Sequence, residues 1–380
     1  MRYGIDAHAI GRHLTGNEVY IRNLLQQYAG LDRKSEFLAY LSMPGADQVV
    51  PPRFAKRWVS NNPFLRLGFD LSRGLRQDKP DLVHVQYTAP LFCPVPVVVS
   101  VHDVSYLEHP EFFPRARRMQ LRMTVERTVR SAAKVVTLSE FSRGGIARAY
   151  GMDPEKITVV PAACSEIFQP QPKAPAKAFV DGRFAIRGPY VLCVGDLQPR
   201  KNPIGLIRAF EELVANYPQL PHSLVFVGKD TWFAPRVHQI AEASPFANRI
   251  HFTGYVNDEE LLQLYNASDL FVFPSFYEGF GIPILEAMAS GRAVACSNTS
   301  AMKEVAGDAA VLFNPYSTRE MVTAMRDLLL DPDFRLRMER LGRQNAARYT
   351  WKQTARQTLD IYQAVVEQRK RTASSVGQHA

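Results

Sequence analysis

The sequence of residues 270–291 is Leu270-Phe-Val-Phe-Pro-Ser-Phe-Tyr-Glu-Gly-Phe-Gly-Ile-Pro-Ile-Leu-Glu-Ala-Met-Ala-Ser-Gly291, and it predicts a strand, a turn and a helix in succession. The apolar run at 270–275 is typical of a strand buried in a parallel sheet. Gly279 and Gly281 indicate a turn after it, and Pro283 suits a position near the start of a short helix. Such a succession is typical of an open α/β sheet.

Two carboxylates in this stretch are candidates for binding. Glu278 falls in the loop at the carboxyl end of the strand, where open α/β sheets bind their ligands. Glu286 falls about one turn into the helix, within reach of the same crevice. The backbone amides of residues 280–283 lie at the helix start and suit anionic or hydroxyl oxygens. Carboxylate pairs are also common on ordinary surfaces, so the spacing alone leaves that alternative open.

Apolar strand-like runs alternate with amphipathic helical stretches along the whole chain, which predicts parallel sheets built from βαβ units. In the first half we expect strands at 2–7, 37–42, 82–86, 97–102, 135–139 and 157–161, and helices at about 18–29, 63–77, 115–131 and 140–149. In the second half we expect strands at 190–195, 223–228, 250–254, 270–275, 293–297 and 310–313. The expected fold class is α/β.

A segment rich in proline and alanine separates the two halves. Residues 168–177 lack periodicity and indicate a semi-extended linker. We therefore expect an N-terminal Rossmann-like domain at 1–167, a linker at 168–188 and a C-terminal Rossmann-like domain at 189–351. The polar residues 376–380 are expected to form a disordered tail.

The composition is that of a globular protein large enough for two domains, with 380 residues, 46% of them hydrophobic and 22% charged. A formal net charge of +9 favours nucleic acid or an anionic membrane surface as partner. No nucleic-acid-binding motif occurs, so we expect no nucleic acid. Four scattered cysteines, an initial strand in place of a signal peptide and no membrane-spanning apolar run predict a cytoplasmic protein.

The stretch at 276–291 closely resembles the glutamate-x7-glutamate signature of the retaining glycosyltransferases of family 4, also called group 1 glycosyltransferases. This resemblance implies the GT-B fold, in which two Rossmann-like domains face each other across a cleft. It implies that Glu278 contacts hydroxyls of the donor sugar and that Glu286 binds the ribose of its nucleotide. It also implies that Trp351 and a helix at about 352–370 cross back onto the first domain.

Two cations stand before a helix in the second half. Arg200 and Lys201 follow the strand at 190–195 and precede an amphipathic helix at 203–217. Fixed cations beside a helix amino end suit a nucleotide diphosphate, although solvated cations at a turn are the alternative. The family has a matching Arg-Lys pair that binds the diphosphate, so the resemblance implies this role for both residues. We expect no metal and no cofactor apart from the nucleotide sugar as co-substrate.

Two elements of the first half also resemble family motifs. Thr15-Gly-Asn-Glu-Val-Tyr20 resembles the amino-terminal glycine loop, whose amides approach the donor phosphate, and Gly16 lacks a side chain that would obstruct this approach. A second glycine of the familiar loop is absent, and a simple helix cap is the alternative. His102-Asp103 resembles the His-Asp element, in which the histidine contacts the sugar's primary hydroxyl and the aspartate orients it or binds acceptor. A buried histidine with a satisfied ring is the alternative.

Loops after several other strands complete the expected site. We expect Ser139 to cap the helix that follows it, with Arg143 one turn further on as a candidate contact to acceptor or phosphate. The resemblance implies that loops after two strands frame the nucleotide base, and that the turn of the opening motif also binds the donor. The residues concerned are Gly254, Tyr255 and Val256, with 228–230, and Phe280, Gly281 and Ile282.

The resemblance implies a hexosyltransferase that retains the anomeric configuration. The motifs at 276–281, 297–300 and 304–310 look most like the mannosyltransferase branch that builds surface polysaccharides such as lipopolysaccharide. We therefore expect GDP-mannose as donor and a glycan or polyprenyl-diphosphate-linked saccharide as acceptor. The alternatives are a UDP-sugar donor, a GT-B epimerase or synthase, and a non-catalytic protein that binds a nucleotide sugar or glycan.

A basic helix is expected at 115–130, where Arg118, Arg122 and Arg130 are interspersed with Met119 and Met123. Such a helix suits peripheral docking to an anionic leaflet on the inner face of the cytoplasmic membrane. A solvated helix face over an ordinary core stripe is the alternative.

Overall fold

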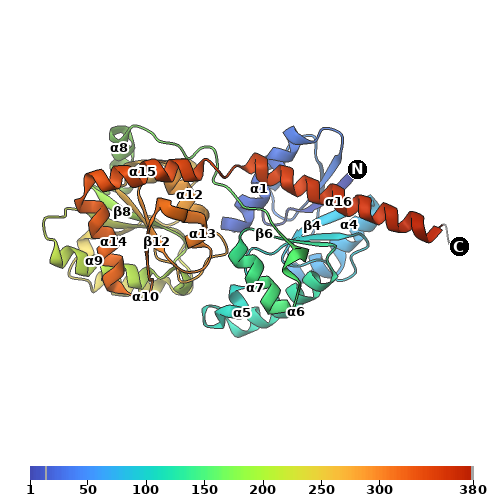
Figure 1. Cartoon of the computed structure of the whole chain (residues 1–380), viewed down its shortest axis with the longest axis horizontal. Coiled ribbons are helices and arrows are strands. Elements are labelled where there is room, and N and C mark those ends of the chain that lie inside the picture. Colours follow the sequence, from blue (N-terminus) through green and yellow to red (C-terminus); the bar gives the residue numbers. More distant parts are fainter. Residues whose placement is uncertain (13–14, 378–380) are drawn as a thin grey trace. The chain divides into compact units, whose positions relative to one another are not determined.

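The computed structural model describes residues 1–12 and 15–377, and the chain divides into two compact units. Unit 1 consists of residues 1–162 and 350–380, and unit 2 of residues 163–349. Each unit contains a parallel sheet with helices on both faces (Figure 1). The predicted α/β class with two Rossmann-like sheets is thereby confirmed.

The sheet of unit 1 has the strand order β3-β2-β1-β4-β5-β6-β7 within the described residues, and every pairing in it is parallel. Its direction of winding reverses between β1 and β4, which are hydrogen-bonded neighbours. The strands are β1 (Arg2–Asp6), β2 (Glu36–Leu41), β3 (Ala55–Trp58), β4 (Leu82–Gln86), β5 (Val97–Ser100), β6 (Lys134–Thr137) and β7 (Ile157–Val159).

Helices cover both faces of this sheet, and its valine-rich strands β4 and β5 lie in the core. A π-helical turn at Arg66–Asp70 joins α3 to α4. The helices of unit 1 are α1 (Thr15–Leu31), α2 (Ala46–Val49), α3 (Pro63–Leu65), α4 (Leu71–Asp78), α5 (Ser105–Glu108), α6 (Arg115–Ser131), α7 (Glu140–Tyr150) and α16 (Trp351–Gly377).

Unit 2 repeats the same plan with the order β10-β9-β8-β11-β12-β13, again all parallel in the part of the chain that the structure describes. Its strands are β8 (Tyr190–Val194), β9 (Ser223–Val227), β10 (Ile250–Phe252), β11 (Leu270–Phe273), β12 (Val294–Ser297) and β13 (Val311–Phe313). Its helices are α8 (Lys173–Phe184), α9 (Pro203–Asn216), α10 (Ala234–Glu242), α11 (Asp258–Ala267), α12 (Ile282–Ala289), α13 (Met302–Ala306), α14 (Thr318–Leu330) and α15 (Pro332–Ala346).

Two segments differ from the sequence-based expectation. The expected linker at 168–188 contains α8, which buries Ala176 and Val180 and packs against α11 of the same unit. Pro175 falls in the first turn of α8, where a missing N–H breaks no helical bond, so the prolines do not prevent the helix. The strand β3 was not expected, because Ala55-Lys-Arg-Trp58 lies at the sheet edge and has no apolar run.

The last helix, α16, is held in unit 1 by buried polar and aromatic contacts. The Tyr362 hydroxyl is hydrogen-bonded to Nδ1 of His84 on β4 and lies 3.1 Å from the Tyr28 hydroxyl of α1. Thr354 Oγ1 donates to the Pro161 carbonyl at 2.7 Å, and the Trp351 ring lies edge-on to Tyr20. The helix continues through the first two residues of the expected tail, whereas 378–380 lie outside the described residues.

No helix among the described residues combines the length and the apolar composition that a membrane span requires.

Candidate functional site

Three charged side chains meet at the topological switch point of unit 2. Arg200 and Lys201 follow β8, and Glu278 follows β11, which is the strand next to β8 at the point where the sheet changes winding direction. Ligands of open α/β sheets bind in the crevice that such a reversal leaves at the carboxyl ends of the strands. The fold thus brings together, as a cluster, three of the residues predicted to bind the donor.

The carboxylate of Glu278 is bound by both cations. Its Oε2 lies 2.7 Å from Arg200 Nη1 and its Oε1 lies 2.7 Å from Lys201 Nζ, and Glu278 as a residue is 7% exposed. Burial alone would raise the pKa of Glu278, but the charges and hydrogen bonds of Arg200 and Lys201 outweigh it and lower the pKa to about 2. At neutral pH the cluster therefore holds one negative and two positive charges.

The backbone fixes the two loops against each other. The Phe276 amide donates to the Arg200 carbonyl at 2.9 Å, and Arg200 Nη1 donates back to the Tyr277 carbonyl at 2.7 Å. Asn202 adopts a left-handed conformation, and its side chain caps α9 by accepting the Gly205 amide at 3.2 Å. Arg200 and Lys201 are consequently held in one helical turn just before the amino end of α9.

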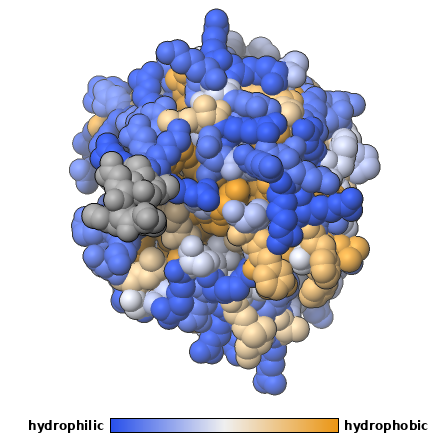
Figure 2. Space-filling model, turned by 90° about the vertical axis from the view of Figure 1, so that its right-hand side faces the viewer, coloured by the Kyte–Doolittle hydropathy of each residue, from blue (hydrophilic) through white to orange (hydrophobic). Residues whose placement is uncertain are grey.

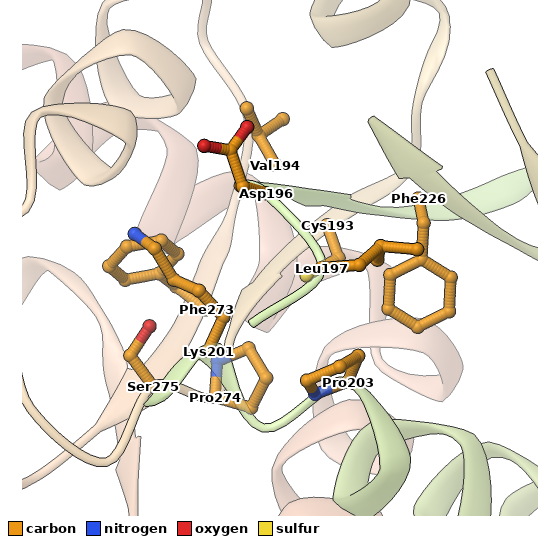
Figure 3. A pocket seen from close by; sticks show the side chains of 11 residues that line it. Cys193, Val194, Asp196, Leu197, Lys201, Pro203, Phe226, Phe273, Pro274 and Ser275 are labelled. Atoms are coloured by element: carbon orange, nitrogen blue, oxygen red, sulfur yellow. The ribbon is translucent and has the colours of Figure 1, made fainter. Parts of the chain in front are cut away.

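Lys201 also lines a small pocket at the ends of β8 and β11 (Figure 3). Its ammonium lies 4.8 Å from the centroid of the Phe273 ring, in a cation–π arrangement. Gly195 lies directly beneath it, since a Cβ there would stand 3.2 Å from Lys201 Cε. The lysine thus reaches Glu278 along a path that a larger residue at 195 would obstruct. The pocket residues are Cys193, Val194, Gly195, Asp196, Leu197, Lys201, Pro203, Phe226, Phe273, Pro274 and Ser275.

Glu286 lies in α12, as predicted, and is buried at 8% exposure. Its Oε2 accepts a hydrogen bond from the Tyr265 hydroxyl at 3.0 Å. Burial, followed by the negative charge of Glu286, raises the pKa of the nearby Cys164 thiol to about 12, so that this cysteine stays protonated. The Tyr265 hydroxyl thus helps to hold the second glutamate in position.

The turn before α12 contains the predicted residues Phe280, Gly281 and Ile282. Gly281 has a φ of +107° and caps the helix, a conformation that side chains disfavour. Phe280 is buried, and its ring lies edge-on to that of Tyr349. Ile282 begins the helix. The Ile284 amide donates a hydrogen bond to the Gly281 carbonyl.

The loops after β9 and β10 lie beside each other. The Gly228 amide donates to the Gly254 carbonyl at 3.0 Å, and a Cβ at Gly228 would clash with the Gly195 carbonyl at 2.2 Å. The Tyr255 ring is 53% exposed and lies 5.1 Å from Lys229 Nζ, whereas Val256 is buried. This flat exposed ring and its cation form a platform of the kind on which a nucleotide base stacks.

In unit 1, His102 lies just after β5 and is 7% exposed. Its Nε2 lies 3.0 Å from the Oε1 atom of Gln86, and Nδ1 is buried without a partner among the described residues. The Tyr20 and Tyr87 rings pack edge-on against the imidazole at 4.7 Å and 5.5 Å. Burial lowers the pKa of His102 to about 4, against a small opposing effect of Asp103, so the ring is neutral at physiological pH.

The structure places Asp103 and Gly16 differently from the sequence-based expectation. Asp103 Oδ1 accepts the amide and the hydroxyl of Ser105, the first residue of α5, at 2.9 Å and 2.6 Å, and among the described residues no hydrogen bond joins it to His102. Gly16 is the second residue of α1 and is exposed, so it belongs to the first helical turn and not to a loop ahead of a helix at 18. The two residues before Thr15 lie outside the described residues.

The helix cap predicted at Ser139 is present, with the Ser142 amide donating to its hydroxyl at 3.1 Å. Arg143 pairs with Glu140 at 2.7 Å on the same helix. Asp331-Pro-Asp333 has the spacing of a metal-binding Asp-x-Asp motif, but Asp331 caps α15 by accepting the Phe334 amide. No cluster of three or more histidine, cysteine or acidic side chains suited to a metal occurs in the described residues.

Sequence reasoning missed the residues that position the predicted ones. Gln86 ends β4 and could have been found as a polar residue at a strand's carboxyl end. Tyr265 acts across the fold, and no local pattern identifies it. Ser300, which accepts the Glu278 amide at 2.9 Å, belongs to the motif at 297–300 that the sequence analysis singled out.

Two Rossmann-like units, each with a parallel sheet, are the architecture of the GT-B fold. Residues 14–164 match the family model described as Glycosyltransferase Family 4, and residues 178–345 match the one described as Glycosyl transferases group 1. The O-antigen chain mannosyltransferase B of Escherichia coli is 33% identical over 266 residues, which are 70% of this chain and 69% of that protein. The chain therefore belongs to the group 1 glycosyltransferases and is an enzyme of that family.

Other relatives share parts of the chain or its fold. The serotype-specific mannosyltransferase WbdA of Escherichia coli is 29% identical over 191 residues, covering 50% of this chain and 23% of that protein. Sucrose-phosphate synthase from Thermosynechococcus elongatus matches with a TM-score of 0.79 at 19% identity, over 96% of this chain and 98% of that one. Anabaena HepE, solved with UDP and glucose, matches with a TM-score of 0.76 at 19% identity, over 96% and 100%.

Proposed function

We propose that the chain transfers mannose from GDP-mannose to a hydroxyl of a glycan, with retention of the anomeric configuration. The observation that carries this proposal is the pairing of Arg200 and Lys201 with Glu278 at the switch point of unit 2. The similarity to the Escherichia coli mannosyltransferases supports mannose, since both are named for that sugar.

The charge cluster suits a nucleotide diphosphate. As the bond between the sugar and the diphosphate breaks, negative charge develops on the leaving phosphate oxygen. Arg200 and Lys201 are consecutive residues of one helical turn and can stabilise that charge together. Glu278, ionised because its pKa is about 2, can accept hydrogen bonds from hydroxyls of the donor sugar.

For the nucleoside, we propose that Glu286 accepts hydrogen bonds from the ribose and that Tyr265 holds it in place. Tyr255, with Gly254 and Val256, forms the surface for the base, and the backbone of the turn before α12 binds the donor. In unit 1, we propose that His102 presents Nδ1 to a sugar hydroxyl while Gln86 fixes its ring. Gly16 offers its amide at the first turn of α1 to phosphate.

Retention follows, in this proposal, from substitution on one face of the donor sugar. The bond from C1 to the leaving phosphate oxygen breaks, the bond from C1 to the acceptor oxygen forms, and a donor phosphate oxygen takes the acceptor proton. The protein contributes position and charge and forms no covalent intermediate. We propose that no metal ion takes part, because the two cations already supply positive charge to the diphosphate.

The acceptor that we propose is a polyprenyl-diphosphate-linked saccharide at the inner face of the cytoplasmic membrane. The O-antigen role in the name of the Escherichia coli relative supports a growing surface polysaccharide. A UDP-sugar is the second candidate donor, because HepE, which shares the fold, was solved with UDP and glucose.

The test is a transfer assay in the presence of a chelator, with GDP-mannose and a mannose-terminated saccharide as substrates. We expect mannose transfer with release of GDP, and nuclear magnetic resonance of the product should show the donor's anomeric configuration. An inverted product would overturn the retaining mechanism, and transfer from UDP-glucose but not from GDP-mannose would overturn the donor. Binding of donor without transfer to any saccharide tried would favour a non-catalytic protein.

A further inference from the structure

Unit 1 exposes a group of large apolar side chains close to one edge of its sheet. Phe64, Leu65, Phe69, Leu91 and Phe92, called here the apolar patch, are between 51% and 76% exposed. Side chains of this size are mostly withdrawn from water in a folded domain, and a group of five marks a contact surface. Figure 2 shows orange, hydrophobic side chains gathered on the lower right of one end of the molecule, among hydrophilic ones.

The segments that carry the apolar patch are tied down. The Leu91 amide donates to the Leu67 carbonyl at 2.9 Å, which joins the loop after β4 to the π-helical turn. Asn62 caps α3 by accepting the Phe64 amide at 2.9 Å. Leu71 and Leu75 of α4, directly after the π-helical turn, are fully buried. Hydrogen bonds and buried neighbours therefore fix the segments that carry the apolar patch.

The same loop is fixed to the basic helix α6. Ala89 donates its amide to Thr128 Oγ1 at 3.0 Å, and Arg127 donates to the Ala89 carbonyl. Thr88 Oγ1 donates to Thr124 Oγ1 at 3.2 Å. The apolar patch and α6 are therefore neighbouring parts of one surface.

That surface is rich in positive charge. Helix α6 contains six arginines and one glutamate, and its exposed side chains include Arg115, Arg117 and Arg122 together with Met119 and Met123. The single glutamate, Glu126, pairs with Arg130 at 3.0 Å. Helix α4, which directly follows the π-helical turn, exposes further cations, Arg73 and Arg76. Two nearby carboxylates already have partners, because Asp70 accepts a hydrogen bond from the Ser60 amide and Glu111 pairs with His109.

The place of this surface in the sheet connects it to the candidate site. The α3 segment follows β3, the loop at 87–92 follows β4, and His102 follows β5. In a parallel sheet these connections leave from the same, carboxyl edge. The apolar patch therefore lies at the edge of unit 1 that carries His102.

We propose that the apolar patch and the arginines of α6 dock unit 1 onto an anionic lipid bilayer. Phenylalanine and leucine side chains enter the boundary between headgroups and acyl chains, while the arginines bind lipid phosphates. The excess of arginine on the rim disfavours a second copy of the chain as the occupant, because two like-charged rims would face each other. This inference rests on the proposed function in one respect, namely that docking brings the carboxyl edge of unit 1 close to a lipid-linked acceptor.

The test is vesicle flotation of the full chain with phosphatidylglycerol-containing vesicles and with phosphatidylcholine vesicles. We expect binding to the anionic vesicles that weakens at high salt. The double substitution Phe64→Ser and Phe69→Ser should weaken it at least about tenfold, and Arg117→Gln with Arg122→Gln should weaken it about fivefold per residue on anionic vesicles only. Leu336→Ser, at an exposed leucine of α15 in unit 2, is the matched control and should change nothing.

Nucleotide binding and melting temperature measured on the same preparations separate this inference from the proposed function. Intact GDP-mannose binding with lost flotation in the Phe64 and Phe69 variant supports docking. Wild-type transfer to a water-soluble saccharide without any vesicle affinity would overturn docking and leave the transferase intact. Vesicle binding without any nucleotide binding would contradict the proposed function alone. If sedimentation shows a dimer that the substitutions dissociate, and vesicles do not bind, a second copy is the occupant and the inference is wrong.

Discussion

Arg200 and Glu278 lie on neighbouring loops of unit 2, and Arg200 Nη1 joins these loops by two contacts, one to Glu278 Oε2 and one to the Tyr277 carbonyl, each at 2.7 Å. The hydrogen bond to the Tyr277 carbonyl holds the Arg200 guanidinium at the switch point, also when a ligand displaces it from the Glu278 carboxylate. Lys201 binds the other oxygen of the same carboxylate, so the cluster carries one net positive charge before donor binds. This excess charge is the basis of the first two predictions.

Removing either cation should cut transfer severely. We expect Arg200→Gln and Lys201→Gln each to lower kcat/KM by about 10²- to 10³-fold, because each withdraws a donor from the developing phosphate charge. Steady-state kinetics with the sugar nucleotide would measure this. Arg319→Gln replaces an exposed arginine of α14 and serves as control. Turnover near the wild-type level in both variants would contradict the phosphate assignment.

Removing the carboxylate should separate nucleotide binding from transfer. Glu278→Gln leaves Arg200 and Lys201 without their counter-ion and raises the net charge of the cluster from one to two. We expect GDP to bind as tightly as to the wild type or more tightly, while transfer falls by at least about 100-fold because the sugar loses its acceptor of hydrogen bonds. Calorimetry with GDP and kinetics with GDP-mannose give the two quantities. A parallel loss of both would argue that Glu278 merely shapes the loop.

The fold could be predicted from sequence wherever buried strands are apolar. All twelve expected strands occur, because runs such as 97–102 and 270–275 carry the signal of burial on both faces. The edge strand β3 and the helix α8 were missed, the first because half-exposed Ala55–Trp58 has no such run. The second was missed because prolines at 170, 172 and 175 suggested an extended segment, although only Pro175 lies inside the helix.

The candidate site could be predicted only in part. Arg200, Lys201 and Glu278 were recognisable because each follows a strand and belongs to a specific motif. Gln86 and Tyr20, which surround His102, come from separate strands and helices, and only the tertiary fold places them there. The alternative was a buried histidine with both ring nitrogens hydrogen-bonded. Only one nitrogen of His102 meets it, since Nε2 has a partner and Nδ1 has none among the described residues.

The low pKa of His102 predicts the pH dependence of its contribution. With a pKa of about 4, the ring is neutral throughout the range from about pH 6 to 8, so the rate should show no inflection near the usual histidine pKa of about 6.5. Protonation below about pH 4 would convert the free Nδ1 from an acceptor into a donor. We expect His102→Ala to lower kcat by about 10- to 100-fold at neutral pH, and Gln86→Ala to lower it less. An inflection near pH 6.5 that His102→Ala removes would contradict the account.

The buried hydroxyl of Tyr362 should matter for the stability of unit 1. It bonds His84 Nδ1 and lies 3.1 Å from the Tyr28 hydroxyl, and all three side chains are fully buried. Tyr362→Phe leaves the imidazole nitrogen without its partner and should cost about 1–3 kcal/mol of unfolding free energy. Urea denaturation would measure this loss, with Tyr316→Phe, at an exposed tyrosine of unit 2, as control. An unchanged midpoint would mean that the network does not hold α16.

Calorimetric titration of the wild type with GDP-mannose in the presence of a chelator is the most direct test that the Arg200–Lys201–Glu278 cluster binds a nucleotide-diphosphate sugar. We predict one binding site, tighter for GDP-mannose and GDP than for UDP-glucose, with affinity lowered about tenfold or more in Arg200→Gln. Binding that needs a divalent metal, or that Arg200→Gln leaves unchanged, would contradict the account.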